Sequence, residues 1–243
     1  MDLIMSIKQN IEAIRENISN AANKTGTKVS DIIIVCVSKN RTREEIHQVL
    51  DAGITHIGES KVQEAQDKIA DLTEYAKKIN LSFNFHMVGH LQTNKVNKAV
   101  DIFDMIQSVD SQKLAQKINE AARERGIKKD ILIEVNTSQE ESKFGATEDA
   151  VLNLIKELAE LNNICVRGLM TMAPAVKDEE ETRPYFRRLR QLRDQINKIN
   201  EPLFKEKIRM DLLSMGMSQD YEIAIEEGAN MLRIGTAIFG GGR

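Results

Sequence analysis

Eight short apolar segments alternate with longer segments of helical periodicity along this chain, and no polar or low-complexity linker interrupts them. This alternation is typical of strand-helix-strand units, which build parallel sheets. The expected strands are 32–39, 55–60, 85–90, 103–109, 131–137, 166–173, 211–217 and 231–237, and a further helix is expected before them at about 3–24.

The segments between the expected strands carry the marks of helices. In TREEIHQVLDAG an apolar stripe is followed by Gly53, and in SQKLAQKINEAARERG another is followed by Gly126, a residue that commonly ends helices. A length of 243 residues is close to the ~250 typical of a closed barrel of eight such units. We therefore expect an α/β fold, a (β/α)8 TIM-type barrel with an extra N-terminal helix, in which residues 1–243 form a single domain. An open doubly wound sheet is the alternative, because periodicity alone does not distinguish it from a closed barrel.

Charge and hydropathy indicate which kinds of molecule the protein is expected to bind. The chain has 34 basic and 37 acidic residues, mixed along its length, so neither a nucleic acid nor a membrane surface is the expected partner. The N-terminal segment shows no apolar block of the kind that a signal peptide needs, and no segment approaches the roughly 20 apolar residues of a membrane span. A small-molecule ligand and a cytoplasmic location are the resulting expectations.

Cysteine and histidine give no sign of a disulfide framework or a metal site. Cys36 and Cys165 each lie within an apolar segment, which favours reduced core residues. The four histidines, His47, His56, His86 and His90, lack the spacing to cysteines or carboxylates that metal sites use, so no metal ligands are assigned.

In a barrel, the polar residues at the carboxyl ends of the strands should meet at one mouth, where active sites of this fold lie. These residues are Ser38, Lys39, Glu59, Ser60, His90, Ser108, Asn136, Thr137, Thr171, Ser214, Ser218, Arg233, Gly235 and Thr236. Basic, hydroxyl and glycine residues at one mouth are suited to an anionic ligand, in particular a phosphorylated one.

Lys39 ends the apolar run of the first expected strand. Partial desolvation there would lower the pKa of its ammonium group towards the neutral amine, which can condense with an aldehyde. The alternative is a solvated lysine that merely caps the strand end.

The last two expected strands carry the signs of a phosphate site. RIGTAIFG places Gly235 and Thr236 before a short helix, and SMGMSQD places Ser218 where it could cap the next helix. Arg233 lies two residues before Gly235 and should point into the barrel, towards a ligand or into a buried ion pair with Glu59 or Glu134. A lysine, an arginine and a phosphate cradle at one mouth suggest pyridoxal phosphate as the ligand.

Four segments, CVSKN, HMVGHLQTNK, RGLMTMAP and LSMGMSQDYEIAIEEGANMLRIGTAIFG, together resemble the pyridoxal phosphate homeostasis protein family, single-domain relatives of the alanine racemase N-terminal barrel. The resemblance runs from about Ile32 to Gly240. It implies pyridoxal phosphate bound covalently as an internal aldimine at Lys39, phosphate contacts from Ser218, Gly235 and Thr236, and Arg233 facing the ring nitrogen. One departure is GESK at 58–61, where the family usually has GEN followed by an aromatic residue, so Ser60 is left out of the site.

The resemblance implies a carrier or buffer that takes part in intracellular pyridoxal phosphate homeostasis, without strong turnover, and supplies pyridoxal-phosphate-dependent enzymes. No catalytic residue is assigned. The alternative is an amino-acid racemase, which needs a second base, and the three tyrosines, Tyr75, Tyr185 and Tyr221, are all expected in helices. A cofactor-free aldolase is a third possibility, for which the first strand offers only Ser38 and Asn40 beside Lys39.

Overall fold

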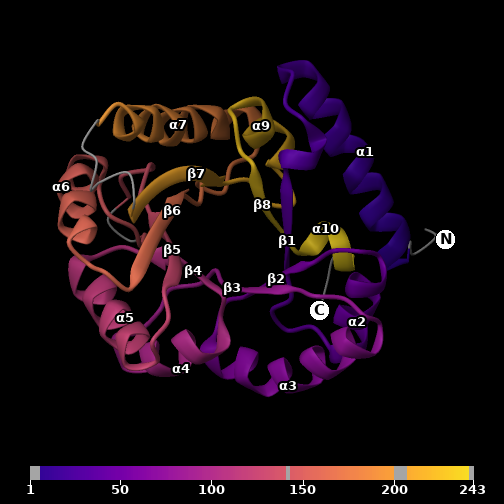
Figure 1. Ribbon diagram of the computed structural model, residues 1–243. Coiled ribbons are helices and arrows are strands. Elements are labelled where there is room, and N and C mark those ends of the chain that lie inside the picture. The colour runs from indigo at the N-terminus through magenta and orange to yellow at the C-terminus, as the bar shows by residue number, and fades with distance from the viewer. Residues whose placement is uncertain (1–5, 141–142, 200–206, 241–243) are drawn as a thin grey trace.

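The computed structural model describes residues 6–140, 143–199 and 207–240. Its eight parallel strands close into a barrel in chain order, with β8 paired to β1 (Figure 1). This closure confirms the barrel and excludes the open sheet. The strands are β1 Ile33–Val37, β2 His56–Glu59, β3 Asn84–Met87, β4 Met105–Val109, β5 Lys129–Glu134, β6 Ile164–Met170, β7 Ile208–Ser214 and β8 Met231–Ile234.

Helices form a ring around the strands, as Figure 1 shows. They are α1 Ile7–Thr25, α2 Arg43–Asp51, α3 Val62–Lys78, α4 Val96–Ile102, α5 Gln112–Glu124, α6 Glu148–Ala159, α7 Arg183–Asn197, α9 Tyr221–Glu226 and α10 Thr236–Phe239. Two of them begin with a capping box, Ser6 with Gln9 at α1 and Thr42 with Glu45 at α2, which satisfies N–H groups of the first turn. The first five residues of the chain, where the expected N-terminal helix began, lie outside the described residues.

The apolar core has two layers because side chains alternate between the two faces of each strand. The inner layer fills the barrel with Val35, Val88, Met105, Leu132, Met170, Leu212 and Met231, and Ile33 and Val37 pack against it. The outer layer lies between strands and helices and includes Cys36, which is fully buried. Residue parity on a strand therefore decides whether a side chain lies in the barrel interior or in the helical layer.

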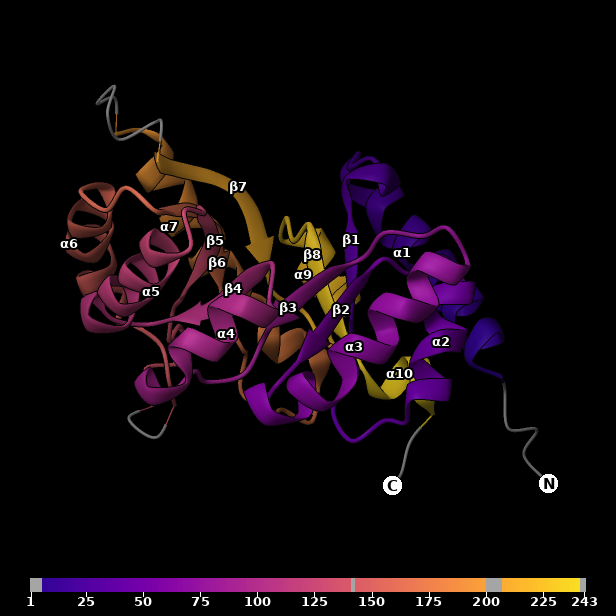
Figure 2. The same cartoon turned by 60° about the horizontal axis from the view of Figure 1, so that its bottom comes forward.

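Both ends of the described chain meet at the closure of the barrel. The side-chain amide of Asn10 in α1 donates to the backbone oxygen of Ile238 in α10, at 2.9 Å. The two helices lie side by side, as Figure 2 also shows. The carboxyl end of β8 thus leads directly into a helix, α10, that is tied to α1. Within the described residues, no helix is long and apolar enough to cross a membrane.

Candidate functional site

Lys39 lies at the mouth of the barrel, immediately after β1. Ile33, Val35 and Val37 face the barrel interior, and Lys39 is the next residue of that alternation. It lies in a turn with Asn40, whose φ is 59°, and its side chain is exposed. The structure thus places Lys39 at the carboxyl end of β1 with a solvated side chain, so the partial desolvation expected of its amine is not observed.

The turn that carries Lys39 is fixed from behind by a buried lysine of α3. Lys68 is 7% exposed and donates to Ser38 O at 2.8 Å, to Glu59 Oε1 at 2.8 Å and to Glu64 Oε1 at 2.7 Å. The same Glu64 oxygen accepts the backbone N–H of Asn40 at 2.6 Å. The carbonyl before Lys39 and the N–H after it are therefore both restrained by one ion-pair cluster.

Two residues expected at the mouth face the helical layer instead. Ser38 and Glu59 are fully buried, and Ser38 Oγ donates to Glu59 Oε1 at 2.6 Å. Burial raises the pKa of Glu59, although hydrogen bonds from Lys68 and Ser38 oppose the rise. The expectation that all strand-end polar groups share one mouth was wrong for this pair, because parity sends each of them outward.

Ser218 joins the loop after β7 to the turn after β8. Its Oγ accepts the backbone N–H of Gly235 at 3.3 Å and that of Ala237 at 3.1 Å. The expectation that Ser218 caps the next helix was wrong, since Asp220 is the N-cap residue of α9. Two backbone N–H groups instead converge on the Ser218 hydroxyl oxygen, and the hydroxyl keeps its own O–H as a donor that suits a phosphate.

The glycines of these two loops allow the close packing that the site needs. Gly216 has φ +88°, and a Cβ there would lie 2.5 Å from Ala224 Cβ. A Cβ at Gly235 would lie 3.1 Å from the backbone oxygen of Val37, so this turn packs against the end of β1. Val37 is two residues before Lys39 in the sequence. Thr236 begins α10 and is exposed.

Arg233 points into the barrel as expected, and it is 4% exposed. It is paired in register with Val35 of β1, and residues paired in this way share a face. Its guanidinium donates from Nη1 to Ser214 Oγ and from Nη2 to Thr171 O, both at 2.7 Å. Burial lowers the pKa of Arg233 to about 10, while the charges of Glu134 and Asp220 oppose the shift.

Among the described residues, Arg233 does not form the buried ion pair with Glu59 or Glu134 that was considered as the alternative. Glu59 is paired with Lys68, and no described carboxylate lies within 4.0 Å of the Arg233 guanidinium. A guanidinium has five N–H groups, so two neutral acceptors leave donor capacity. The barrel therefore holds a buried cation that can still donate to a ligand.

Glu134 is a further titratable group of the inner compartment. It follows Leu132 on the inward face of β5, is 2% exposed, and its Oε2 has no hydrogen-bond partner. Burial raises the pKa of Glu134 to about 7, Arg233 opposes the rise and Asp110 adds to it. The sequence reasoning treated this residue only as a possible partner of Arg233.

Sequence reasoning also missed two inward residues behind Arg233. Gln107 of β4 and His86 of β3 are fully buried or nearly so and are hydrogen-bonded to one another. Strand alternation could have identified Gln107, because it lies two residues after the inward Met105 and therefore faces the interior. Within the described residues no cluster of three metal-ligating side chains is found.

The described donors fit a ligand with three chemical features. Lys39 offers an amine for a carbonyl carbon, the Ser218 hydroxyl offers a neutral donor for a phosphate, and Arg233 offers a buried cation for a ring acceptor. The three sets come from β1, β7 and β8, and β1 and β8 are adjacent strands.

The chain is similar over most of its length to known proteins of one family. Residues 9–242 match the family described as "Alanine racemase, N-terminal domain". A relative named "Pyridoxal phosphate homeostasis protein" from Aquifex aeolicus is 36% identical over 236 residues, covering 97% of this chain and 98% of its own.

Two solved structures are also similar. A structure described as an unknown protein from Bifidobacterium adolescentis has 36% identity and a TM-score of 0.90, covering 96% of this chain and 94% of its own. PipY of Synechococcus elongatus PCC7942, solved with PLP bound, has 30% identity and a TM-score of 0.80, covering 97% of this chain and 100% of its own.

Proposed function

The chain belongs to the family of the alanine racemase N-terminal domain, among whose members are its relatives named pyridoxal phosphate homeostasis proteins, and we propose that it binds pyridoxal phosphate as a carrier or buffer. Residues 1–243 then act as one cofactor-binding domain. The cofactor is held covalently on Lys39 and supplied to enzymes that depend on it.

The observation that carries the proposal is the buried Arg233 that has no carboxylate partner among the described residues. A desolvated cation is costly unless a compensating acceptor is at hand, and two neutral acceptors compensate it only in part. The anionic phosphate and the basic ring nitrogen of pyridoxal phosphate both favour such a cation nearby. In our assignment Arg233 faces the ring nitrogen and Ser218, Gly235 and Thr236 hold the phosphate.

Bound pyridoxal phosphate supplies an aldehyde that combines with amines and a ring that withdraws electrons when its nitrogen is protonated. Arg233 limits the second property. Its pKa of about 10 keeps it a hydrogen-bond donor at neutral pH, so a proton on the facing ring nitrogen would meet a like charge. This residue therefore favours retention of the cofactor over carbanion chemistry.

An amino-acid racemase is the second candidate, and Glu134 is the residue that favours it. A racemase needs an acid and a base on opposite sides of the substrate carbon. Two of the tyrosines bond to neighbouring elements: Tyr75 OH donates to Asp51, and Tyr221 OH accepts from Asn17 at 3.0 Å. Glu134, with a pKa of about 7 and an inward position, is the group that such an enzyme would use.

The test of binding is the visible absorption spectrum of the purified protein with added pyridoxal phosphate, before and after borohydride reduction. We expect a yellow species that reduction removes, with the pyridoxyl mass on the peptide that contains Lys39. Lys39→Ala should lose the band, and Lys61→Ala, an exposed lysine nearby, should keep it. A colourless wild-type protein would refute the proposal.

The test of turnover is the interconversion of D- and L-amino acids by the loaded protein. A carrier shows no interconversion above that of free pyridoxal phosphate. Turnover that Lys39→Ala and Glu134→Gln each abolish would instead establish the racemase.

A further inference from the structure

A continuous series of hydrogen bonds crosses the interior of the barrel behind Arg233. Arg233 Nη1 lies 2.7 Å from Ser214 Oγ, Ser214 Oγ lies 2.7 Å from Gln107 Oε1, and Gln107 Nε2 lies 3.1 Å from His86 Nδ1. His86 Nε2 in turn lies 2.9 Å from His56 Nδ1. Five side chains from five strands thus form one series.

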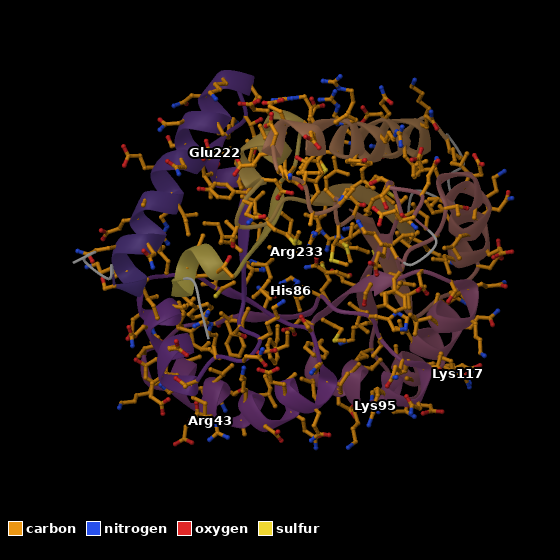
Figure 3. All side chains as sticks on the ribbon, turned by 180° about the vertical axis from the view of Figure 1, so that it is seen from behind. Arg43, His86, Lys95, Lys117, Glu222 and Arg233 are labelled. Carbon is orange, nitrogen blue, oxygen red and sulfur yellow. The ribbon has the colours of Figure 1, made fainter. Side chains whose placement is uncertain are left out.

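These five side chains occupy inward positions near the barrel axis. His86, Gln107, Ser214 and Arg233 are between 0 and 4% exposed, while His56 is half-buried at the start of β2. Figure 3 shows Arg233 and His86 at the centre of the ring, whereas Arg43, Lys95, Lys117 and Glu222 lie on its outside. The series therefore runs from the ligand site towards the opposite end of the barrel.

The series runs in one direction, because Arg233 can only donate and the Gln107 amide turns its oxygen to Ser214 and its nitrogen to His86 and Met231. Ser214 accepts from Arg233 and donates its own proton to Gln107 Oε1. The Gln107 nitrogen then donates to His86, which leaves His86 Nδ1 without a proton.

The same logic fixes the two imidazoles. A neutral His86 that is unprotonated at Nδ1 carries its proton on Nε2 and donates it to His56 Nδ1. His56 then carries its proton on Nε2. The orientation of the Gln107 amide thereby selects the tautomers of both histidines.

Burial favours the neutral form of both histidines. Burial, with the neighbouring His56 as a second cause, lowers the pKa of His86 to about 3. Burial also lowers the pKa of His56, although Asp104 opposes it. An extra proton on either ring would place two donors face to face.

We infer that Gln107 and His86 are positioning residues, which hold the Arg233 guanidinium in place for its ligand through this one-way series. The series itself is independent of the ligand; its effect on cofactor binding rests on the proposed function. If the link at His86 is removed, the Gln107 amide nitrogen keeps only the weak sulfur acceptor of Met231, at 3.3 Å. The amide can then turn more easily, and the hydroxyl of Ser214 is held less firmly as an acceptor for Arg233.

The first test is nitrogen NMR of the ligand-free protein. We expect His86 and His56 in the Nε2–H tautomer and separate Nη1 and Nη2 signals for a guanidinium whose rotation is hindered. In His86→Leu the Nη signals should merge, and in His86→Asn, whose oxygen replaces the Nδ1 acceptor, they should stay separate. His47→Leu, a histidine of α2 outside the barrel interior, is the matched control. An Nδ1–H tautomer at His86 in the wild-type protein would overturn the inference.

The second test is the affinity of the same variants for pyridoxal phosphate. His86→Leu should bind about tenfold more weakly, as expected when a residue that orients a ligand-binding group is lost, with His86→Asn close to the wild type. Equal loss in both variants, or loss in neither, would overturn the positioning role. If the wild-type protein does not bind pyridoxal phosphate, the proposed function fails, while the NMR result still decides whether the series exists.

Discussion

The ammonium group of Lys68 lies 2.8 Å from the backbone oxygen of Ser38, so a buried cation of the helical layer contacts the peptide that immediately precedes Lys39. Through Glu64 the same cation also restrains the residue that follows Lys39. A long lysine side chain on an exposed turn would otherwise lose much entropy on binding. The restraint reduces the part of that cost that comes from the backbone.

Lys68→Met should destabilise the protein by about 3–5 kcal/mol, because it leaves Glu59 as a buried carboxylate without its cation. Urea unfolding measures this loss. Glu59→Met with Lys68→Met should regain most of the stability, since no uncompensated charge remains. The double variant should still form less of the borohydride-reducible adduct on Lys39, since the turn has lost its restraint. Normal adduct formation in that variant would show that Lys68 serves stability alone.

Glu134→Gln should change the dependence of stability on pH. The folded-state pKa of Glu134, about 7, lies above its ordinary value of 4.5, so between these values the folded protein binds more protons than the unfolded chain. This group therefore lowers the free energy of unfolding as the pH rises through that window. The variant should lack this contribution, so above pH 7 its free energy of unfolding should exceed that of the wild type by at most about 3 kcal/mol. Parallel curves of the free energy of unfolding against pH for the two proteins, from pH 5 to 8, would contradict a raised pKa at Glu134.

Ser218→Ala should weaken the binding of pyridoxal phosphate roughly tenfold, the typical cost of a hydrogen bond to a charged group. Pyridoxal, which lacks the phosphate, should bind the variant and the wild type alike. Titrations of both compounds in phosphate-free buffer, followed by absorbance, measure the difference. An equal loss for pyridoxal would mean that the hydroxyl supports the loop and does not contact the phosphate.

Gly216→Ala should destabilise the protein by about 2–4 kcal/mol, because a left-handed backbone and a clash with Ala224 act together. Gly26→Ala is the matched control. Gly26 has a similar φ of +71°, but no atom lies within 4 Å of the added Cβ, so only about 1–2 kcal/mol of backbone strain is expected. Urea unfolding of both variants separates the cost of the steric clash from the cost of backbone strain. Equal losses of unfolding free energy in the two variants would contradict the crowding at Gly216.

Much of the fold followed from periodicity, since each of the eight expected strands overlaps an observed one. Closure was correctly expected from the eight units and the chain length, but periodicity alone did not establish it, because it depends on pairing between β1 and β8, which no local pattern records. At the site, alternation correctly directed Arg233 inward. Alternation also implied the outward direction of Ser38 and Glu59, although this was not used. The hydrogen-bond partners of Ser38, Glu59 and Ser218 were not predictable, because they come from elsewhere in the chain and are identified only by three-dimensional contacts.

The pairing of β1 with β8 also has a consequence for the order of events during synthesis. Lys39 directly follows the first strand, whereas Arg233 lies in the last strand and the turn at Gly235 directly follows it. Contacts this far apart in sequence are slow to form. A nascent chain therefore carries the reactive amine long before it has the groups that would retain an aldehyde there. Capture of the ligand should begin only when the final strand is in place, so bound ligand would report on completed assembly of the molecule.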